Sequence, residues 1–378
     1  MKILYISHSV IPSIAANSIH VCKMTQAIAN LGHDVELLAI KPSIFNKVNN
    51  KEISTQYGLK KDITLKTFPR FRGMKLKDYF FQVSRYCKKY KPDLVYTRSI
   101  QIANIICNAG VPVVYECHGD IHETEIEDFK LLIEKSHLMK VIVISKALYK
   151  ILADKYDSKL KDKMYIAHDG VDLERFENNH KLPEFFREKL QLPQKYTVMY
   201  SGHLYEGRGI EIVFGLAKKF TDLSFVVVGG RDEDVNNCQK MASEKEVNNI
   251  LFTGFVNNGV LSEYLGAANV LLMPYQSKVS VAGNFGNSVS WMSPLKMFEY
   301  MATLRPIISS DLPALREVLD DNQSLFCQPD DVEQWANALH KLLDDIESSN
   351  LLAFNAFQNV KKYTWNVRAK NILAQVDL

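Results

Sequence analysis

A glycine-rich turn over residues 200–209 (YSGHLYEGRG) joins the end of an expected strand to the start of an expected helix. Gly202, Gly207 and Gly209 allow the backbone to approach a ligand closely. Arg208 places a permanent cation beside a helix N-terminus, and this combination suits a phosphate group. A glycine-rich turn with a solvated arginine fits the same residues, so this motif by itself leaves both interpretations open.

A second anion-binding pattern is the sequence SPLKMFEYMA, which begins at Ser293. Ser293 is a preferred N-cap and Pro294 a preferred first helical residue. The free amides of Leu295 and Lys296 would then point out of the helix toward an anion. Glu299 follows about one turn later, where it can accept hydrogen bonds from vicinal hydroxyls. The alternative is a capped amphipathic helix with an exposed Glu299. Taken with the first turn, the pattern predicts a nucleoside diphosphate site.

Polar residues also follow a strand in the first half of the chain, in the sequence ECHGD that begins at Glu116. His118 is expected to donate to a substrate hydroxyl or to orient a carbonyl, and Asp120 and Glu123 could act on protons. A histidine whose hydrogen bonds are satisfied within the turn is the alternative. The six cysteines form no C-x-x-C pair, and no His/Cys cluster has zinc spacing, so the sequence predicts no metal site.

Short β-branched runs alternate with helical patterns in two successive series. Strands are expected at Lys2–Ser7, Asp34–Ala39, Ile63–Phe68, Asp93–Thr97, Val111–Cys117, Val141–Ser145 and Met164–Ala167, then at Thr197–Ser201, Phe225–Val228, Ile250–Phe252, Val270–Met273, Pro306–Ser309 and Leu325–Cys327. Helices are expected near 18–32, 75–91, 100–109, 125–138 and 146–156, then near 209–220, 236–246, 259–267, 294–303, 312–319 and 331–346. This alternation predicts an α/β fold with two doubly wound parallel sheets, joined by a polar connector over 176–195, with the ligand in the cleft between them.

Two common functions of doubly wound folds do not fit. The first strand leads into HSVIPS, without the G-x-G-x-x-G turn of a nicotinamide dehydrogenase, and no Walker loop is present. The chain also has no run of about 18 apolar residues, and its short apolar N-terminus resembles a strand more than a signal peptide.

Motifs distributed over nearly the whole chain resemble one known family. They are Leu31–Val35 (LGHDV), Pro92–Tyr96 (PDLVY), Val143–Lys146 (VISK), Asp169–Asp172 with Phe176, Gly202–Gly209, Gly254–Val256, Tyr264, Ala267–Ala268 with Pro274, and Tyr363–Trp365. Together they are similar to the motifs of the family 4 glycosyltransferases. That resemblance implies the GT-B fold, with two Rossmann-like domains facing a central cleft. The N-terminal domain, 1–190 with a crossing helix at 364–378, would bind the acceptor, and the C-terminal domain, 191–363, would bind the nucleotide sugar.

The resemblance also implies a function and a site. The enzyme would move a sugar, with retention at the anomeric carbon, from a nucleoside diphosphate sugar (most simply a UDP-sugar) to a glycan, lipid-linked or other cell-envelope acceptor. His118, Arg208 and Glu299 would act at the reaction centre. The residues expected to bind the donor are Asn17, Gly202, His203, Arg208, Gly254, Phe255, Val256, Ser293, Pro294, Leu295, Lys296 and Glu299. No metal or other cofactor is expected, because fixed cations and helix ends would stabilise the leaving diphosphate.

The sequence departs from the family pattern at three positions. His203 stands where the family has a phosphate-binding arginine, and Arg208 where it has a lysine. Trp291 replaces the first glutamate of the E-x7-E pair, which contacts the donor sugar in the family, whereas Glu299 matches the second. We expect nearby backbone amides and the long loop 276–292 to supply replacement contacts.

The net charge of +3 conceals an uneven distribution. The first 190 residues carry 30 basic and 22 acidic side chains, and 11 of the basic ones lie in residues 60–91. One interpretation is a helix with a solvated basic face; the other is a surface for an anionic membrane, which would make the enzyme cytoplasmic and peripheral on the cytoplasmic face. A nucleotide-sugar epimerase and a nucleic-acid-binding module are the alternative functions, although no nucleic-acid motif accompanies the basic residues.

Overall fold

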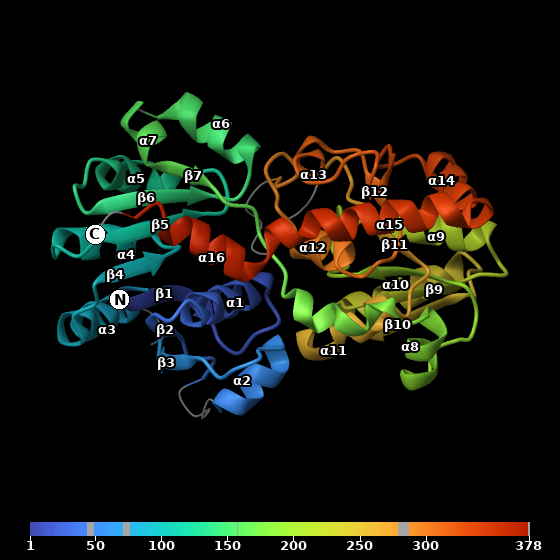
Figure 1. Ribbon diagram of the computed structural model, residues 1–378, viewed down its shortest axis with the longest axis horizontal. Coiled ribbons are helices and arrows are strands. Elements are labelled where there is room, and N and C mark those ends of the chain that lie inside the picture. Colours follow the sequence, from blue (N-terminus) through green and yellow to red (C-terminus); the bar gives the residue numbers. More distant parts are fainter. Residues whose placement is uncertain (44–48, 71–75, 157, 279–286, 377–378) are drawn as a thin grey trace. The chain divides into compact units, whose positions relative to one another are not determined.

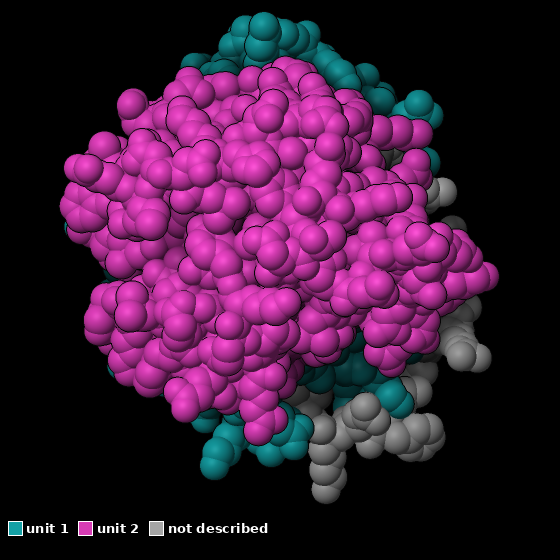
Figure 2. Space-filling model, turned by 90° about the vertical axis from the view of Figure 1, so that its right-hand side faces the viewer, with its two compact units in different colours: residues 1–169, 365–378 teal, residues 170–364 magenta. Residues whose placement is uncertain are grey.

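The computed structural model describes residues 1–43, 49–70, 76–156, 158–278 and 287–376. The chain forms two compact units, which are coloured separately in Figure 2. Unit 1 contains Met1–Asp169 and Trp365–Leu378, and unit 2 contains Gly170–Thr364. In both units β-branched and aromatic runs form the strands, and amphipathic segments between them form the helices (Figure 1).

Unit 1 is built on a seven-stranded parallel sheet with the order β3-β2-β1-β4-β5-β6-β7. Its strands are β1 (Lys2–Val10), β2 (Asp34–Ile40), β3 (Thr64–Phe68), β4 (Leu94–Thr97), β5 (Val113–Cys117), β6 (Leu138–Val143) and β7 (Met164–Ile166). Its helices are α1 (Ala16–Asn30), α2 (Asn50–Tyr57), α3 (Lys77–Tyr90), α4 (Ile100–Asn108), η1 (Glu123–Glu125), α5 (Ile126–Ile133), α6 (Lys146–Lys155), α7 (Ser158–Lys163) and α16 (Trp365–Leu373). The last of these, α16, packs against α1 (Figure 1).

Unit 2 is built on a six-stranded parallel sheet with the order β10-β9-β8-β11-β12-β13. Its strands are β8 (Thr197–Ser201), β9 (Ser224–Val228), β10 (Ile250–Gly254), β11 (Val270–Met273), β12 (Ile307–Ser310) and β13 (Leu325–Cys327). Its helices are η2 (Leu173–His180), α8 (Pro183–Lys189), α9 (Ile210–Lys219), α10 (Asp232–Glu244), α11 (Asn258–Gly266), α12 (Leu295–Met301), α13 (Pro313–Arg316), α14 (Val332–Asp344), α15 (Ile346–Val360) and η3 (Lys361–Tyr363).

Alternate residues of the unit 2 strands supply two hydrophobic cores, one on each face of the sheet. Val226 and Val228 belong to one core, whereas Phe225 and Val227 belong to the other. This alternation follows from the two-residue repeat of a strand, and it explains why β9 is apolar throughout. The prediction of doubly wound parallel sheets is therefore confirmed.

The strand order reverses between β1 and β4 in unit 1, and between β8 and β11 in unit 2. In doubly wound sheets, ligands bind beyond the carboxyl ends of the strands at such a reversal. In unit 2 the glycine-rich turn at 202–209 follows β8, and in unit 1 His118 follows β5, which is next to β4. Both predicted motifs therefore lie at the binding edge of their own sheet.

The boundary between the units differs from the expected residue 190. Residues 170–190 belong to unit 2, because Phe176 of η2 and Phe186 of α8 are buried in its core and both elements pack against α11. The expected connector over 176–195 is thus largely helical. Its aromatic residues, Phe176 and Phe186, place it in unit 2, although most of its residues are polar.

Helix α3, which lies in the basic segment 60–91, packs on the sheet of unit 1 through apolar and aromatic side chains. Tyr79 and Val83 of α3 are buried, and the Tyr79 hydroxyl donates to the Ser7 carbonyl oxygen at 2.5 Å. The Tyr86 hydroxyl donates to Glu36 Oε2 at 2.7 Å. Residues 71–75, which include two of the basic side chains, lie outside the described part of the chain.

Candidate functional site

The turn after β8 brings two chain segments of unit 2 into close contact. Gly209 has φ 78°, in the left-handed region, and a Cβ there would lie 1.7 Å from the Pro274 carbonyl oxygen. Only glycine fits this position. The start of α9 is therefore held directly against the residue that follows β11, so the two loops at the strand reversal form one surface.

Two cations on this surface lie against tyrosine rings. Lys296 Nζ is 4.0 Å from the centre of the Tyr200 ring and 5.0 Å from that of Tyr275. The Arg208 guanidinium carbon is 5.3 Å from the centres of both the Tyr205 and Tyr275 rings. Within the described residues, neither cation forms an ion pair with a carboxylate, and Arg208 Nε has no hydrogen-bond partner. Burial and the neighbouring Arg208 hold the pKa of Lys296 well below its usual range.

His203 lies beside these cations but adds no charge of its own. Its ring stacks on Tyr205 with the centres 4.8 Å apart. Burial, followed by Arg208 and Lys296, lowers the pKa of His203 to about 4. The imidazole is consequently neutral near pH 7. The position at which the family pattern has an arginine therefore lacks a cation.

Helix α12 begins one residue later than expected. Its N-cap is Pro294, which has an extended conformation and no capping side chain, and Leu295 is its first residue. Ser293 is therefore not the N-cap, because the first backbone bond of the helix runs from Met297 N to Pro294 O. With seven residues α12 is short, and its amides are a weaker anion site than the sequence suggested.

Glu299 is buried rather than exposed, with 8% of its surface accessible. Asn258 Nδ2 donates to Glu299 Oε1 at 3.1 Å, and Arg175 Nη1 is 4.0 Å from the same oxygen. Asn258 in turn accepts from Arg175 Nη1 at 2.7 Å. Among the residues described, Asn258 and Arg175 both contact the Glu299 carboxylate at Oε1.

The remaining predicted donor residues occupy different places. Gly254 ends β10 with φ 69°, and its carbonyl oxygen accepts from Gly229 N at 2.9 Å. The next residue, Phe255, is 44% exposed, and Val256 packs on the unit 2 core. Asn17 is in the first turn of α1 and belongs to unit 1. The loop residues 279–286 lie outside the described part of the chain, so the expectation for loop 276–292 stays a prediction.

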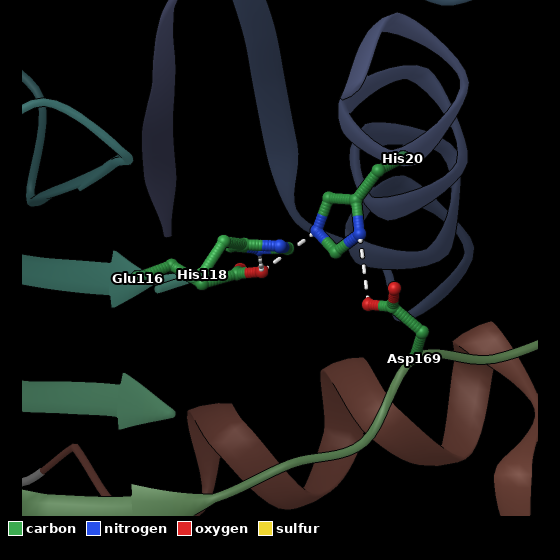
Figure 3. A group of neighbouring side chains, drawn as sticks. All are labelled: His20, Glu116, His118 and Asp169. Atoms are coloured by element: carbon green, nitrogen blue, oxygen red, sulfur yellow. Dashed lines mark hydrogen bonds and ion pairs between the residues drawn. The ribbon is translucent and has the colours of Figure 1, made fainter. Parts of the chain in front are cut away.

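In unit 1, His118 belongs to a cluster of buried polar side chains. The ring nitrogen Nε2 of His118 contacts Glu116 Oε1. The same carboxylate oxygen lies 2.8 Å from His20 Nε2, and His20 Nδ1 lies 3.0 Å from Asp169 Oδ1 (Figure 3). The His20 ring therefore stands between two carboxylates. Burial, and then Arg98, lower the pKa of His118 to about 4.

This cluster has the residue types of a metal site but not its arrangement. One ligand atom from each of His20, Glu116, His118 and Asp169 lies within 4.8 Å of the others. However, Arg368 Nη2 donates to Glu116 Oε1 at 3.0 Å, and both imidazoles meet that same oxygen. The nitrogens of the cluster therefore surround the Glu116 carboxylate and not a vacant position for a metal ion. A divalent ion bound to Glu116 Oε1 would also lie next to the positively charged Arg368 guanidinium. We interpret the cluster as a hydrogen-bonded network.

The sequence motif singled out His118 but not the residues that contact it. Glu116 is two residues earlier, near the end of β5, and the two-residue repeat of an extended chain places both side chains on one face, so this signal was available. Arg368 carried no such signal, since it is 252 residues away. Asp120, expected to act on protons, instead pairs with Lys155, and Glu123 is exposed.

Two sequence families match this chain in succession. The family described as "Glycosyltransferase Family 4" matches residues 18–175, and the family described as "Glycosyl transferases group 1" matches residues 195–345. Among curated proteins, the phosphatidyl-myo-inositol mannosyltransferase of Mycolicibacterium smegmatis is 27% identical over 210 residues. That alignment covers 54% of this chain and 49% of the relative, so the chain spans about half the length of the relative it matches.

Solved structures share the fold over nearly the entire chain. A sucrose-phosphate synthase from Thermosynechococcus elongatus has a TM-score of 0.77 at 18% identity and covers 99% of this chain and 98% of its own. Anabaena HepE in complex with UDP-glucose has a TM-score of 0.74 at 15% identity, with full coverage of both chains. These likenesses confirm the GT-B architecture of two Rossmann-like units. None of the helices in the described ranges is long and apolar enough to cross a membrane.

Proposed function

Because the chain belongs to the family 4 glycosyltransferases, we propose that it transfers a sugar from a nucleoside diphosphate sugar to an acceptor with retention at the anomeric carbon. The observation that carries the donor assignment is the pair of cations, Arg208 and Lys296, held against tyrosine rings at the strand reversal of unit 2. A glycan or lipid-linked molecule is the proposed acceptor.

The two cations favour a ligand with two negative charges. Removing a charge from water is costly unless a partner of opposite sign replaces the solvent. Arg208 and Lys296 have tyrosine faces around them, and such contacts recover only about 0.5–2 kcal/mol each. A diphosphate would supply the missing charge and would accept hydrogen bonds from both side chains.

We assign Lys296 the role left vacant by the neutral His203. Its Nζ lies so close to Gly202 that a Cβ at that glycine would be 2.8 Å away. The Lys296 ammonium group therefore lies beside the turn 202–209, in which the family pattern has an arginine at the position of His203. The side chain of Lys296, rather than its backbone amide, is the group we expect to contact the diphosphate.

The rest of the nucleotide would be held by neighbouring elements. Glu299 Oε2 is the proposed acceptor for the ribose hydroxyls, while Oε1 stays bonded to Asn258. Gly254, Phe255 and Val256 are the proposed base region. We favour uridine, because the structurally similar HepE was solved with UDP and with UDP-glucose. A hexose or an N-acetylhexosamine is the proposed sugar.

The leaving diphosphate would be stabilised by protein groups alone. Arg208 and Lys296 are fixed in place before the reaction, so they can stabilise the charge that develops on the leaving oxygen without reorganisation. We therefore propose that the enzyme requires no metal ion. His118 of unit 1 is the proposed contact to the donor sugar, and unit 1 is proposed to bind the acceptor.

Helix α3 supports a second proposal, attachment to an anionic membrane surface. Phe81 is 70% exposed, and Lys77, Arg85 and Lys88, which are also exposed, share its face of the helix at spacings of four and three residues. An exposed aromatic side chain among cations is the pattern of an interfacial helix. This surface would place the enzyme beside a lipid-linked acceptor.

A thermal-shift screen tests the donor assignment. UDP and UDP-sugars are expected to raise the melting temperature more than GDP, ADP or their sugars, because ligand binding stabilises the folded state by mass action. Lys296→Met and Arg208→Met should reduce the shift. Lys240→Met, which removes an exposed lysine of α10, is the matched control. An equal loss in the control, or no shift with any nucleotide, would contradict the proposal.

The reaction itself is tested with the nucleotide that binds. Acceptor-dependent release of UDP, with a product whose anomeric configuration equals that of the donor, is expected. Addition of a chelator should leave the rate unchanged. Conversion of the free nucleotide sugar without any acceptor would instead identify an epimerase.

A further inference from the structure

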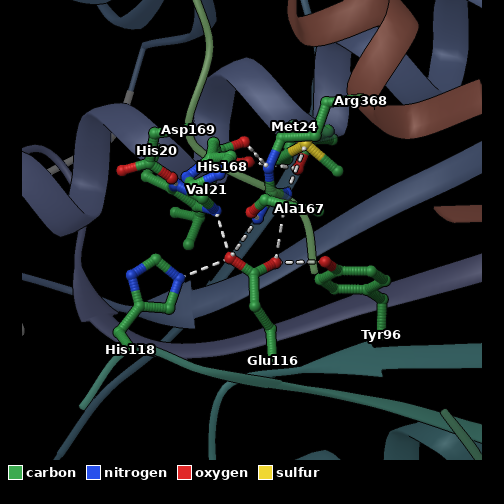
Figure 4. A network of polar contacts seen from close by, with 11 residues as sticks. His20, Val21, Met24, Tyr96, Glu116, His118, Ala167, His168, Asp169 and Arg368 are labelled. Carbon is green, nitrogen blue, oxygen red and sulfur yellow. Dashed lines mark hydrogen bonds and ion pairs between the residues drawn. The ribbon is translucent and has the colours of Figure 1, made fainter. Parts of the chain in front are cut away.

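The carboxylate of Glu116 is the centre of the polar network in unit 1. The residue is on β5 and its accessible surface is 1%. Figure 4 shows its two oxygens in contact with side chains of other residues. Oε2 accepts from the Tyr96 hydroxyl, and Oε1 contacts the nitrogens of His118, His20 and Arg368. Because burial alone would raise the pKa of Glu116, it is Arg368, followed by His20 and His118, that holds this pKa well below its usual range.

The ionised carboxylate dictates which nitrogen of His118 carries the proton. A carboxylate only accepts hydrogen bonds, so the nitrogen that contacts it must be a donor. That nitrogen is Nε2. A neutral imidazole has a single N–H, and the other nitrogen keeps a lone pair. Nδ1 of His118 is therefore left as a hydrogen-bond acceptor.

Arg368 fixes the carboxylate from a distant part of the sequence. Its Nη2 and Nη1 lie 3.0 and 3.4 Å from Glu116 Oε1 and Oε2. Its Nε donates to the His168 carbonyl oxygen at 2.9 Å, and Nη2 donates to the Ala167 carbonyl oxygen at 3.2 Å. These bonds join α16 to the residues that follow β7 and to the carboxyl end of β5. The orientation of the Glu116 carboxylate is thus determined by several bonds at once.

We propose that Glu116, held by Arg368, is the positioning residue of His118: it orients the ring with Nε2–H toward the protein and Nδ1 toward the substrate. This inference rests on the proposed function, since His118 is the group proposed to contact the donor sugar. It reverses the role expected from the sequence, because His118 then accepts a hydrogen bond from a sugar hydroxyl and does not donate one. The C-terminal helix becomes part of the substrate-binding machinery through Arg368.

The tautomer can be measured in the unaltered protein. Long-range 15N–1H spectra of protein labelled with 15N-histidine distinguish an Nε2–H ring from an Nδ1–H ring, and His118→Asn identifies the signal. We expect a single Nε2–H tautomer that remains neutral from about pH 5.5 to 8. An Nδ1–H tautomer, or an imidazolium in that range, would overturn the proposal, and this measurement requires no variant of Glu116.

Two substitutions at His118 separate orientation from simple packing. The amide oxygen of Asn can replace an acceptor at the Nδ1 position, whereas Gln reaches the Nε2 position. We expect His118→Asn to keep at least about tenfold more kcat than His118→Gln. Greater activity of the Gln variant would contradict the assignment of Nδ1 as the acceptor.

Glu116→Gln tests the positioning role. The Gln amide can donate to His118, so the Nδ1–H tautomer should appear, and kcat should fall about 10- to 100-fold, the range seen when a partner that orients a metal-bound histidine is removed. Binding of UDP should be unchanged, because the cations proposed to hold it belong to unit 2. If the variant binds UDP and keeps both the tautomer and kcat, this inference is wrong. If the unaltered protein fails to bind UDP, the proposed function is wrong instead.

Discussion

Lys296 and Gly202 fit together so closely that the ammonium group occupies the space of a missing side chain. A Cβ at Gly202 would lie 2.8 Å from Lys296 Nζ, and Tyr200, two residues earlier, places its ring 4.0 Å from the same nitrogen. The lysine is thereby enclosed by an aromatic face and a glycine backbone. A charge in such a place has little solvent and, among the residues that the structure describes, no carboxylate partner, which makes it sensitive to an arriving anion.

The affinity for UDP should depend on pH through Lys296. Burial and Arg208 lower the pKa of this amine, and a bound diphosphate favours its charged form and raises the pKa again. Binding should therefore take up a proton, and affinity should fall as pH rises through the lowered pKa of Lys296 in the free protein. Calorimetry in buffers of different ionisation enthalpy measures the uptake. Lys296→Met should bind about tenfold more weakly and without proton uptake. An uptake that persists in this variant would assign the proton to another group.

Replacing His203 by arginine should strengthen nucleotide binding. The pKa of His203 is lowered to about 4, so the ring is neutral at pH 7 and a permanent cation would add to the site. We expect His203→Arg to increase UDP affinity about five- to tenfold. The free variant should melt at a lower temperature, because the new charge is close to Arg208 and Lys296. His203→Gln, which stays neutral, is the control. Equal affinities of the two variants would show that the diphosphate does not reach this position.

Glu299 should be coupled to the ribose and not to the diphosphate. The unaltered protein is expected to bind UDP about tenfold more tightly than 2′,3′-dideoxy-UDP, because the buried carboxylate would lose its hydroxyl partners. In Glu299→Ala this preference should disappear, while the effect of Lys296→Met on UDP binding persists. A preference that survives the loss of Glu299 would place the ribose elsewhere. Competition calorimetry with the two nucleotides provides the comparison.

Membrane attachment should require both the charge and the aromatic side chain of α3. Binding to anionic vesicles is expected at low salt and should weaken as salt screens the lysines and arginines. Phe81→Ala should reduce partitioning about tenfold, since burial of an aromatic side chain contributes about 1.5–3 kcal/mol. The control is Leu351→Ala, because Leu351 is similarly exposed, at 59%, but lies on α15 of unit 2. Equal binding to neutral and anionic vesicles would refute this role of α3.

Local patterns in the sequence predicted the strands well and some helices poorly. Each of the expected strands is present, because a buried parallel strand requires a short apolar run that is easily recognised. Helix α15 was missed, although it has 15 residues. Its Leu351 and Phe354 are exposed, so its apolar residues do not follow one face. Helix α8 was missed because the prolines at its ends resemble those of a linker.

The candidate site was predictable where one segment carries the chemistry. Arg208 and Glu299 lie in motifs that can be read directly, and so does His118. The tyrosines around the cations could not be assigned, since Tyr200 is on β8 and Tyr275 follows β11, and these two strands become neighbours only in the folded sheet. The network around Glu116 was equally hidden, because its cation follows the whole of unit 2 in the sequence.

The place of Arg368 in the chain has a consequence for biosynthesis. The ribosome adds this residue 252 positions after Glu116, when every residue of unit 2 has already been made. Until then the Glu116 carboxylate lacks its guanidinium, and an uncompensated buried charge is strongly destabilising. We expect a nascent chain that ends at residue 364, held on the ribosome by a linker that fills the exit tunnel, to show a protease-resistant unit 2. Unit 1 of the same chain should still be sensitive to protease. The half of the protein that is encoded first would thus be the last to mature.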